Sequence, residues 1–83
     1  MLTKQEFIKM KKEIREMCLP SVMDLCEKVG LTEYEKDILI CVNQNMSRVA
    51  TAFKLSSSEW LISTTLRTIL TKIKDYREYT SVD

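Results

Sequence analysis

The sequence contains no histidine, one glycine and one proline. There is consequently no histidine to complete a zinc site or to act as a catalytic base, and no glycine-rich loop to hold a phosphate. The three cysteines, Cys18, Cys26 and Cys41, include no C-x-x-C pair. We therefore expect no metal, no cofactor and no enzymatic activity. The scarcity of glycine and proline also argues against the many turns of an all-β domain.

Long apolar runs are absent as well. No stretch approaches the roughly 20 apolar residues of a membrane span, and the first residues, MLTKQEFIKMKK, lack the unbroken apolar segment of a secretion signal. An odd number of cysteines favours small buried thiols in a reducing compartment. These features predict a cytoplasmic protein that does not enter a membrane.

What the chain does contain is helical patterning. Its 83 residues, 45% hydrophobic and 30% charged, suit one small globular domain. The first thirty residues predict a helical hairpin. The first helix, which we expect to end near Leu19, carries an apolar face of Phe7, Met10, Ile14 and Met17. Pro20 suits the first turn of the second helix and Gly30 its C-cap, with an apolar stripe of Val22, Leu25, Cys26 and Val29.

Residues 31–76 predict three further helices. Thr32 and Glu35 have the spacing of a capping box, ahead of the apolar Ile38, Leu39, Cys41 and Val42. Ser47 suits the cap of a short helix that reaches about Leu55, with Val49, Ala52 and Phe53 facing inward. Ser58 suits the cap of the last helix, whose apolar stripe is Ile62, Leu66, Ile69, Leu70 and Ile73.

The opposite face of the last helix is what the domain can offer to a partner. It carries Trp60, Thr64, Arg67, Thr68 and Thr71, with Ser63 and Lys74 at its edge. We expect residues 77–83 to be a frayed tail. The predicted fold is an all-α, single-domain bundle of about five helices, in which a helix-turn-helix follows the N-terminal helical hairpin of residues 1–30.

The segment Leu31–Ile73 resembles, without a gap, the helix-turn-helix domain of LuxR-type regulators and the related region four of sigma factors. LTEYEKDIL is similar to the family's opening L-T-x-x-E-x-x-V-L, and Met46 and Ser47 match the L-S before the scaffold helix. Ala52 and Leu55 match its small and apolar positions, and Ser58 and Glu59 match the S-E that opens the recognition helix. The chain departs from the family at the turn, where Ser56 and Ser57 replace glycine and an apolar residue.

The resemblance implies a transcriptional regulator that binds double-stranded DNA. It places two sets of residues on the duplex. Phosphates would be contacted by Ser47, Arg48, Lys54, Ser58 and Lys74; bases would be approached from the face that holds Trp60, Ser63, Thr64, Arg67 and Thr68. The distribution of charge agrees with DNA binding, because Asn45–Lys74 contains five basic residues and one acidic residue, whereas the flanking segments contain more acidic than basic residues. Such charge is also expected where lysine and arginine merely solvate helix surfaces.

The same helical scaffold is also compatible with a different function, the binding of a protein partner. Trp60 and the adjacent Leu61 form an apolar spot of the kind that anchors protein partners, unless the N-terminal helices cover it. The protein would then be an adaptor or inhibitor that acts on the transcription machinery. A homodimer is also open, through the N-terminal helices, where Phe7, Met10, Met17 and Met23 could supply an adaptable apolar surface.

Overall fold

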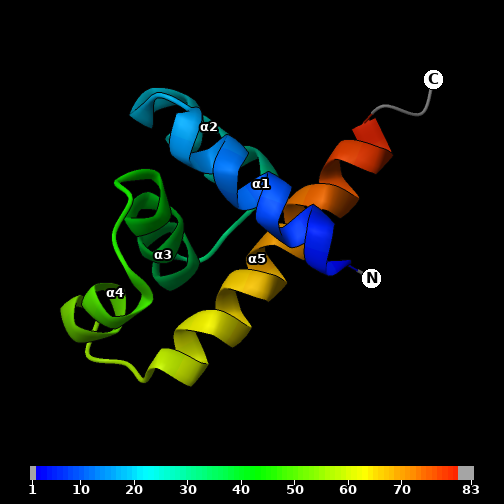
Figure 1. Ribbon diagram of the computed structural model, residues 1–83. Coiled ribbons are helices and arrows are strands. Elements are labelled where there is room, and N and C mark those ends of the chain that lie inside the picture. Colours follow the sequence, from blue (N-terminus) through cyan, green and yellow to red (C-terminus); the bar gives the residue numbers. More distant parts are fainter. Residues whose placement is uncertain (1, 81–83) are drawn as a thin grey trace.

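The computed structural model describes residues 2–80, which form five α-helices and no strand. In chain order the helices are α1 (Lys4–Glu16), α2 (Leu19–Val29), α3 (Glu33–Asn43), α4 (Arg48–Lys54) and α5 (Glu59–Thr80). Figure 1 shows α5 running the length of the molecule, with α4 beside its N-terminal end and α1 crossing it further along. The expected all-α bundle of about five helices is confirmed.

The helix starts lie where local sequence predicts them. Thr32 accepts a hydrogen bond from the Glu35 amide at 3.2 Å, and the Glu35 carboxylate accepts one from the Thr32 amide at 3.0 Å, so the capping box is complete. Ser47 and Ser58 each accept a bond from an amide three residues on, at 3.1 and 3.0 Å. Each such cap stabilises its helix by about 1 kcal/mol.

The break between α1 and α2 comes earlier than expected. The first helix ends at Glu16 rather than near Leu19, which is already the first residue of α2; Pro20 lies in the first turn of α2, as predicted. The side-chain amide of Asn43, on α3, donates to the carbonyls of Ile14 and Met17 at 2.9 and 2.7 Å. Hydrogen bonds from α3 therefore satisfy two carbonyl groups at the C-terminal end of α1.

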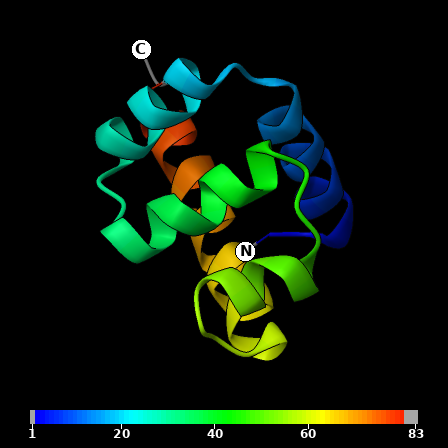
Figure 2. The same ribbon diagram turned by 90° about the vertical axis from the view of Figure 1, so that its left-hand side faces the viewer.

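The two N-terminal helices pack on the rest of the molecule more than on each other. Both α1 and α2 contact α3 and α5, while the contact between α1 and α2 is slight. Figure 2 shows α3 crossing in front of α5, with α1 to one side of it and α2 above. The two helices expected to form a hairpin over residues 1–30 are therefore an open pair, and both pack against α3.

The C-terminal end of α2 is capped as the sequence predicts. Gly30 ends the helix in the left-handed conformation, with φ of 79°.

The core runs along the inner side of α5. All five predicted stripe residues of α5 are buried, as are all four predicted on α3. The buried hydrophobic residues on the remaining helices and the N-terminus are Leu2, Met10, Ile14, Val22, Cys26 and Ala52. Truncating a buried leucine or isoleucine to alanine typically costs about 2 to 5 kcal/mol, so this stripe fixes the position of α5.

Three expectations about individual residues are wrong. Val49 and Phe53 do not face inward; they are 60% and 88% exposed, because α4 turns Thr51 and Ala52 toward the core instead. Cys18 is exposed, unlike the buried Cys26 and Cys41, because it caps α2 at the surface.

The end of the chain also differs from the expected frayed tail. Residues 77–80 continue α5, and the Arg77 guanidinium lies 3.0 Å from the Glu13 carboxylate of α1. Residues 81–83, the rest of that predicted tail, lie outside the described residues.

The linker between α4 and α5 makes a polar contact with α3. Ser56, in this linker, takes the left-handed conformation, with φ of 53°. The Ser57 hydroxyl lies 2.7 Å from the Tyr34 hydroxyl of α3. The turn is therefore tied to α3 by a hydrogen bond.

Candidate nucleic-acid interface

The starts of α4 and α5 lie side by side. Arg48, the first residue of α4, donates to the Glu59 carboxylate at 3.4 Å and to the Ser63 hydroxyl at 3.3 Å. Glu59 is the first residue of α5. The predicted phosphate-contacting residues Ser47, Arg48 and Ser58 therefore gather at one end of the molecule, next to the first turns of α5.

The predicted outward face of α5 is open to solvent along its N-terminal half. Trp60 is 74% exposed, so the N-terminal helices do not cover it. Thr64, Arg67 and Thr68 are exposed as well. Further along, Thr71 is half-buried. In Figure 1 the N-terminal half of α5, coloured yellow, projects away from α1 and α2. This projecting part is the accessible section of the helix.

The threonines on this face use their hydroxyl protons within the helix. Thr64 donates to the Trp60 carbonyl at 2.9 Å, and Thr68 donates to the Thr64 carbonyl at 3.2 Å. Thr71 makes the same bond to the Arg67 carbonyl at 2.8 Å. Because a hydroxyl has a single proton, these side chains retain only acceptor lone pairs and a methyl group for a partner.

The positive charge predicted for this region is partly neutralised by acids from other helices. Lys72 lies 2.8 Å from the buried carboxylate of Glu35, and Lys74 lies 2.7 Å from the partly exposed carboxylate of Glu6. The hydrogen bond from Lys74 is the main cause that lowers the pKa of Glu6 to about 2. The bond from Lys72 likewise lowers the pKa of Glu35, and the bond to Glu6 raises the pKa of Lys74.

These two lysines hold α1 and α3 against α5. Lys74 was predicted to contact phosphate, but the structure places it in a half-buried ion pair at the side of α5. Lys54, in contrast, is exposed, and its side chain makes no hydrogen bond or ion pair within residues 2–80. Arg67 lies over the Phe7 ring, 5.1 Å from its centroid, and remains exposed. Of the five basic residues between positions 45 and 74, those still available to a polyanion are therefore Lys54, Arg67 and Arg48, which is exposed although it pairs with Glu59.

Lys11 joins this region, which the sequence did not indicate. A cavity of about 190 Å³ lies between α1 and the α4–α5 unit, and its lining includes Lys11, Arg48, Ser63 and Leu66. Only the packing of α1 against α5 brings Lys11 close to Arg48. No signal in the sequence specifies that packing, since Lys11 is one of several lysines on an amphipathic helix.

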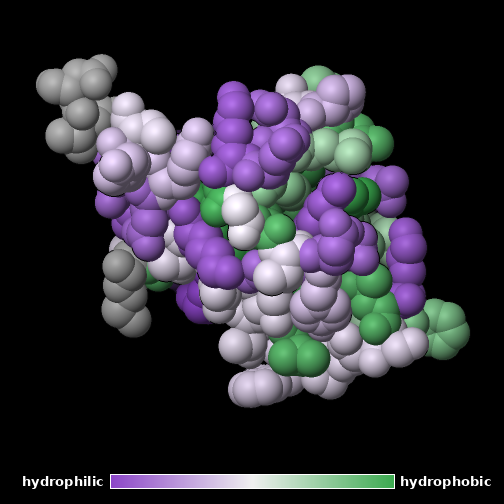
Figure 3. Space-filling view, turned by 180° about the vertical axis from the view of Figure 1, so that it is seen from behind, coloured by the Kyte–Doolittle hydropathy of each residue, from purple (hydrophilic) through white to green (hydrophobic). Residues whose placement is uncertain are grey.

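Exposed apolar side chains gather at the same end of the molecule. Val49 and Phe53 project from α4, and Trp60 and Leu61, which is 40% exposed, project from the start of α5. Figure 3 shows apolar residues on the outer surface at the lower right, over the end that carries α4 and the start of α5. The predicted dimer surface of the N-terminal helices is much less available on α1, because Met10 is buried and Phe7 and Met17 pack against the core. Its fourth residue, Met23 on α2, is 42% exposed.

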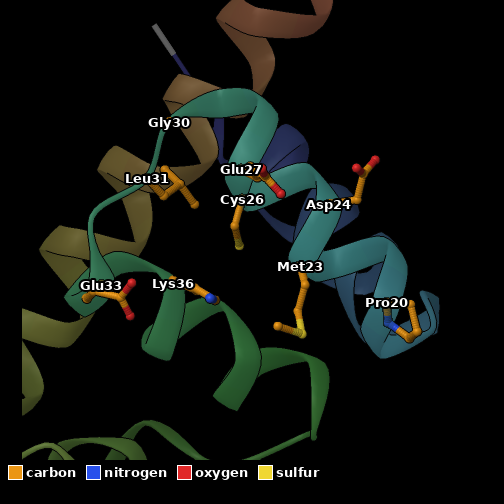
Figure 4. Close-up of a pocket in the computed structure, with 9 residues that line it drawn as sticks. All are labelled: Pro20, Met23, Asp24, Cys26, Glu27, Gly30, Leu31, Glu33 and Lys36. Carbon is orange, nitrogen blue, oxygen red and sulfur yellow. The ribbon is translucent and has the colours of Figure 1, made fainter.

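A larger cavity lies far from this end. It has a volume of about 520 Å³ and opens between α2 and α3. Figure 4 shows Met23 and Lys36 extending toward one another across it, and Asp24 turned away. The Cys26 sulfur also points into the space, and burial raises the pKa of that thiol. The thiol is therefore held in its unreactive protonated form at neutral pH.

Within residues 2–80, no group of three or more histidine, cysteine, aspartate or glutamate side chains could hold a metal ion. No helix in this part of the chain is long and apolar enough to cross a membrane.

Comparison of the chain with known protein families, curated proteins and solved structures found no match in any of the three. The resemblance of Leu31–Ile73 to LuxR-type and sigma region-four domains stays a prediction from the residues themselves.

Proposed function

We propose that this protein is a small DNA-binding transcriptional regulator, in which α4 and α5 form a helix-turn-helix and α5 is the recognition helix. The observation that carries the proposal is the contact of Arg48 with Glu59 and Ser63. It brings the start of α4 beside the first turns of α5, where the exposed face of Trp60 and Thr64 begins. A recognition helix enters the major groove by its N-terminal residues while the preceding helix crosses the phosphate backbone.

The roles of the residues follow from their exposure and partners. Arg67, Thr64 and Thr68 face the bases, because they occupy the exposed side of the projecting half of α5. Arg48 and Lys54 contact phosphates. Lys74 is left out of the interface, because its 2.7 Å ion pair with Glu6 already neutralises its charge.

Two phosphate contacts, those of Arg48 and Lys54, predict a modest dependence on salt. Each neutralised phosphate contributes about −0.9 to the slope of log affinity against log salt, so two contacts give a slope of about −1.8. Raising the salt from about 50 to about 200 mM should then weaken binding about 12-fold.

The experiment is fluorescence anisotropy of a mixed-sequence DNA duplex titrated with the protein across this salt range. Lys54→Ala should weaken binding to all duplexes alike, whereas Arg67→Ala should cost about 1 to 3 kcal/mol at one base position and relax sequence preference. Lys28→Ala is the matched control, since Lys28 lies on α2 at the opposite end of the molecule (Figure 1). Absence of binding at low salt would contradict the proposal.

One observation favours a second function, that of a protein-binding adaptor or inhibitor on the same scaffold. Phe53 is 88% exposed and Trp60 is 74% exposed, on adjacent helices. Aromatic side chains in such positions commonly anchor a partner. In this case the partner is a component of the transcription machinery, and the α4–α5 end binds it in place of DNA.

The second function has its own test. A fluorophore on the exposed Cys18 reports binding through anisotropy when purified RNA polymerase is added. Phe53→Ser and Trp60→Ala should both abolish the rise. Tyr79→Ser should not, because Tyr79 is 83% exposed near the C-terminal end of α5, far from α4. Equal responses from all three variants would rule out an anchor at the α4–α5 end.

A further inference from the structure

The exposed face of α5 is poor in hydrogen-bond donors and rich in methyl groups. Thr64 and Thr68 have committed their protons to helix carbonyls at 2.9 and 3.2 Å. The side chains of this face that still carry N–H donors are Trp60 and Arg67, and Arg67 is stacked on Phe7. On a helix of about 3.6 residues per turn, Trp60, Thr64, Arg67 and Thr68 fall within about 100° of one another. A partner therefore meets them as one surface.

The base pairs of DNA differ in the hydrogen-bonding and apolar groups that they present to such a surface. In the major groove guanine offers two acceptors, which need donors from the protein. An A·T pair also offers acceptors, at adenine N7 and thymine O4, and each kind of pair offers one amino donor, but only the A·T pair carries the thymine C5-methyl group. A threonine whose proton is already used complements that pair, because its methyl can contact the thymine methyl and its oxygen can accept from adenine.

We infer that α5 recognises A·T-rich major groove through the thymine methyl groups, with the methyls of Thr64 and Thr68 as the specificity-determining contacts. This inference rests on the proposed DNA-binding function and adds the class of sequence that is bound. Leu61, 40% exposed beside this face, extends the apolar contact. Arg67 allows a single guanine at the edge of the site.

The test begins with selection of bound duplexes from a random pool, using the whole protein at low salt. The selected duplexes should be enriched in A·T pairs. Each thymidine is then replaced in turn by deoxyuridine, which lacks only the C5-methyl group. Burial of one such carbon contributes enough to predict about a fourfold loss of affinity for each methyl contacted.

Two substitutions at Thr64 separate the methyl from the hydroxyl. Thr64→Ser keeps the hydroxyl and removes the methyl, so it should make affinity for the thymidine and deoxyuridine duplexes equal at one position. Thr64→Val keeps a methyl and removes the hydroxyl, so it should preserve the difference. Circular dichroism of both variants checks that the helices are intact.

The outcomes distinguish failure of the inferred thymine-methyl recognition from failure of DNA binding itself. If no duplex is retained from the pool, the proposed DNA binding fails. If duplexes are retained but show no A·T enrichment, or bind equally well with deoxyuridine, DNA binding stands and the methyl recognition is overturned. Loss of the thymidine preference in Thr64→Val as well as in Thr64→Ser would also overturn it, because a methyl group at position 64 would then not be enough to read the thymine methyl.

Discussion

The ion pair between Glu35 and Lys72 should be among the stronger polar contributions to the stability of the fold. It joins the start of α3 to the middle of α5, and its two Nζ–carboxylate distances are 2.8 and 3.1 Å. Glu35→Gln removes the charge while keeping an oxygen that can accept the Thr32 amide, so the capping box survives. The substitution therefore isolates the ion pair.

The magnitude lies between two limits. Exposed ion pairs contribute up to about 1 kcal/mol, and hydrogen bonds to charged groups about 1.5 to 3 kcal/mol. The Glu35 side chain is 9% exposed but that of Lys72 is 44% exposed, so solvent screens one partner and we expect about 1 to 2 kcal/mol. For a domain of this size that corresponds to a fall in Tm of about 4 to 16 °C.

The assay is thermal and urea unfolding of the wild type, Glu35→Gln, Lys72→Met and the double variant. Glu13→Gln is the control, because the Glu13–Arg77 pair has a similar distance but both side chains are about two-fifths exposed. We expect less than about 0.5 kcal/mol for the control. A coupling energy near zero between Glu35 and Lys72, or equal losses in Glu35→Gln and Glu13→Gln, would refute the reasoning.

The same pair predicts the direction of a pH dependence. Glu35 has a lower pKa in the folded chain than in the unfolded chain, where a glutamate titrates near about 4.3. Its contribution is therefore complete above that pH and is lost as pH falls through the folded-state pKa. Glu6, with its pKa lowered to about 2, acts in the same direction. Glu35→Gln should flatten the loss of stability below about pH 4.

Three further predictions concern separate features. Asn43→Ala removes two hydrogen bonds to the end of α1, including that to the Met17 carbonyl at 2.7 Å, and should lower the free energy of unfolding by about 1 to 3 kcal/mol in urea titrations. In the native protein one thiol, that of Cys18, should react quickly with a thiol reagent, because it is exposed and its hydrogen bond to a neighbouring serine lowers its pKa. In the unfolded protein all three thiols should react. Glu59→Gln removes the carboxylate that pairs with Arg48 and should tighten DNA binding in the same anisotropy titration.

The features that sequence predicted correctly are set by short-range chemistry. The caps at Thr32, Ser47 and Ser58 depend on amides three residues away, and Gly30 depends only on its own backbone. The stripe of α5 is long enough for one periodicity to stand out. The outward face of α5 followed as its complement, and with it most of the candidate interface.

The features that were missed depend on longer-range packing or on too short a pattern. Seven residues make fewer than two turns, so the apolar residues of α4 fit more than one orientation, and Phe53 was assigned to the wrong side. Lys72 appeared as a free positive charge because its partner Glu35 is 37 positions away. Lys11 lines the same cavity as Arg48 only because α1 packs against α5.

The two sides of α5 are subject to different constraints during evolution. Its buried side, from Ile62 to Ile73, must preserve shape and volume to keep the bundle folded. On its exposed side, most substitutions at positions such as Thr64 and Thr68, other than glycine or proline, change stability by about 0.5 kcal/mol or less. Descendants of this chain can therefore acquire new binding preferences one residue at a time, each intermediate remaining folded.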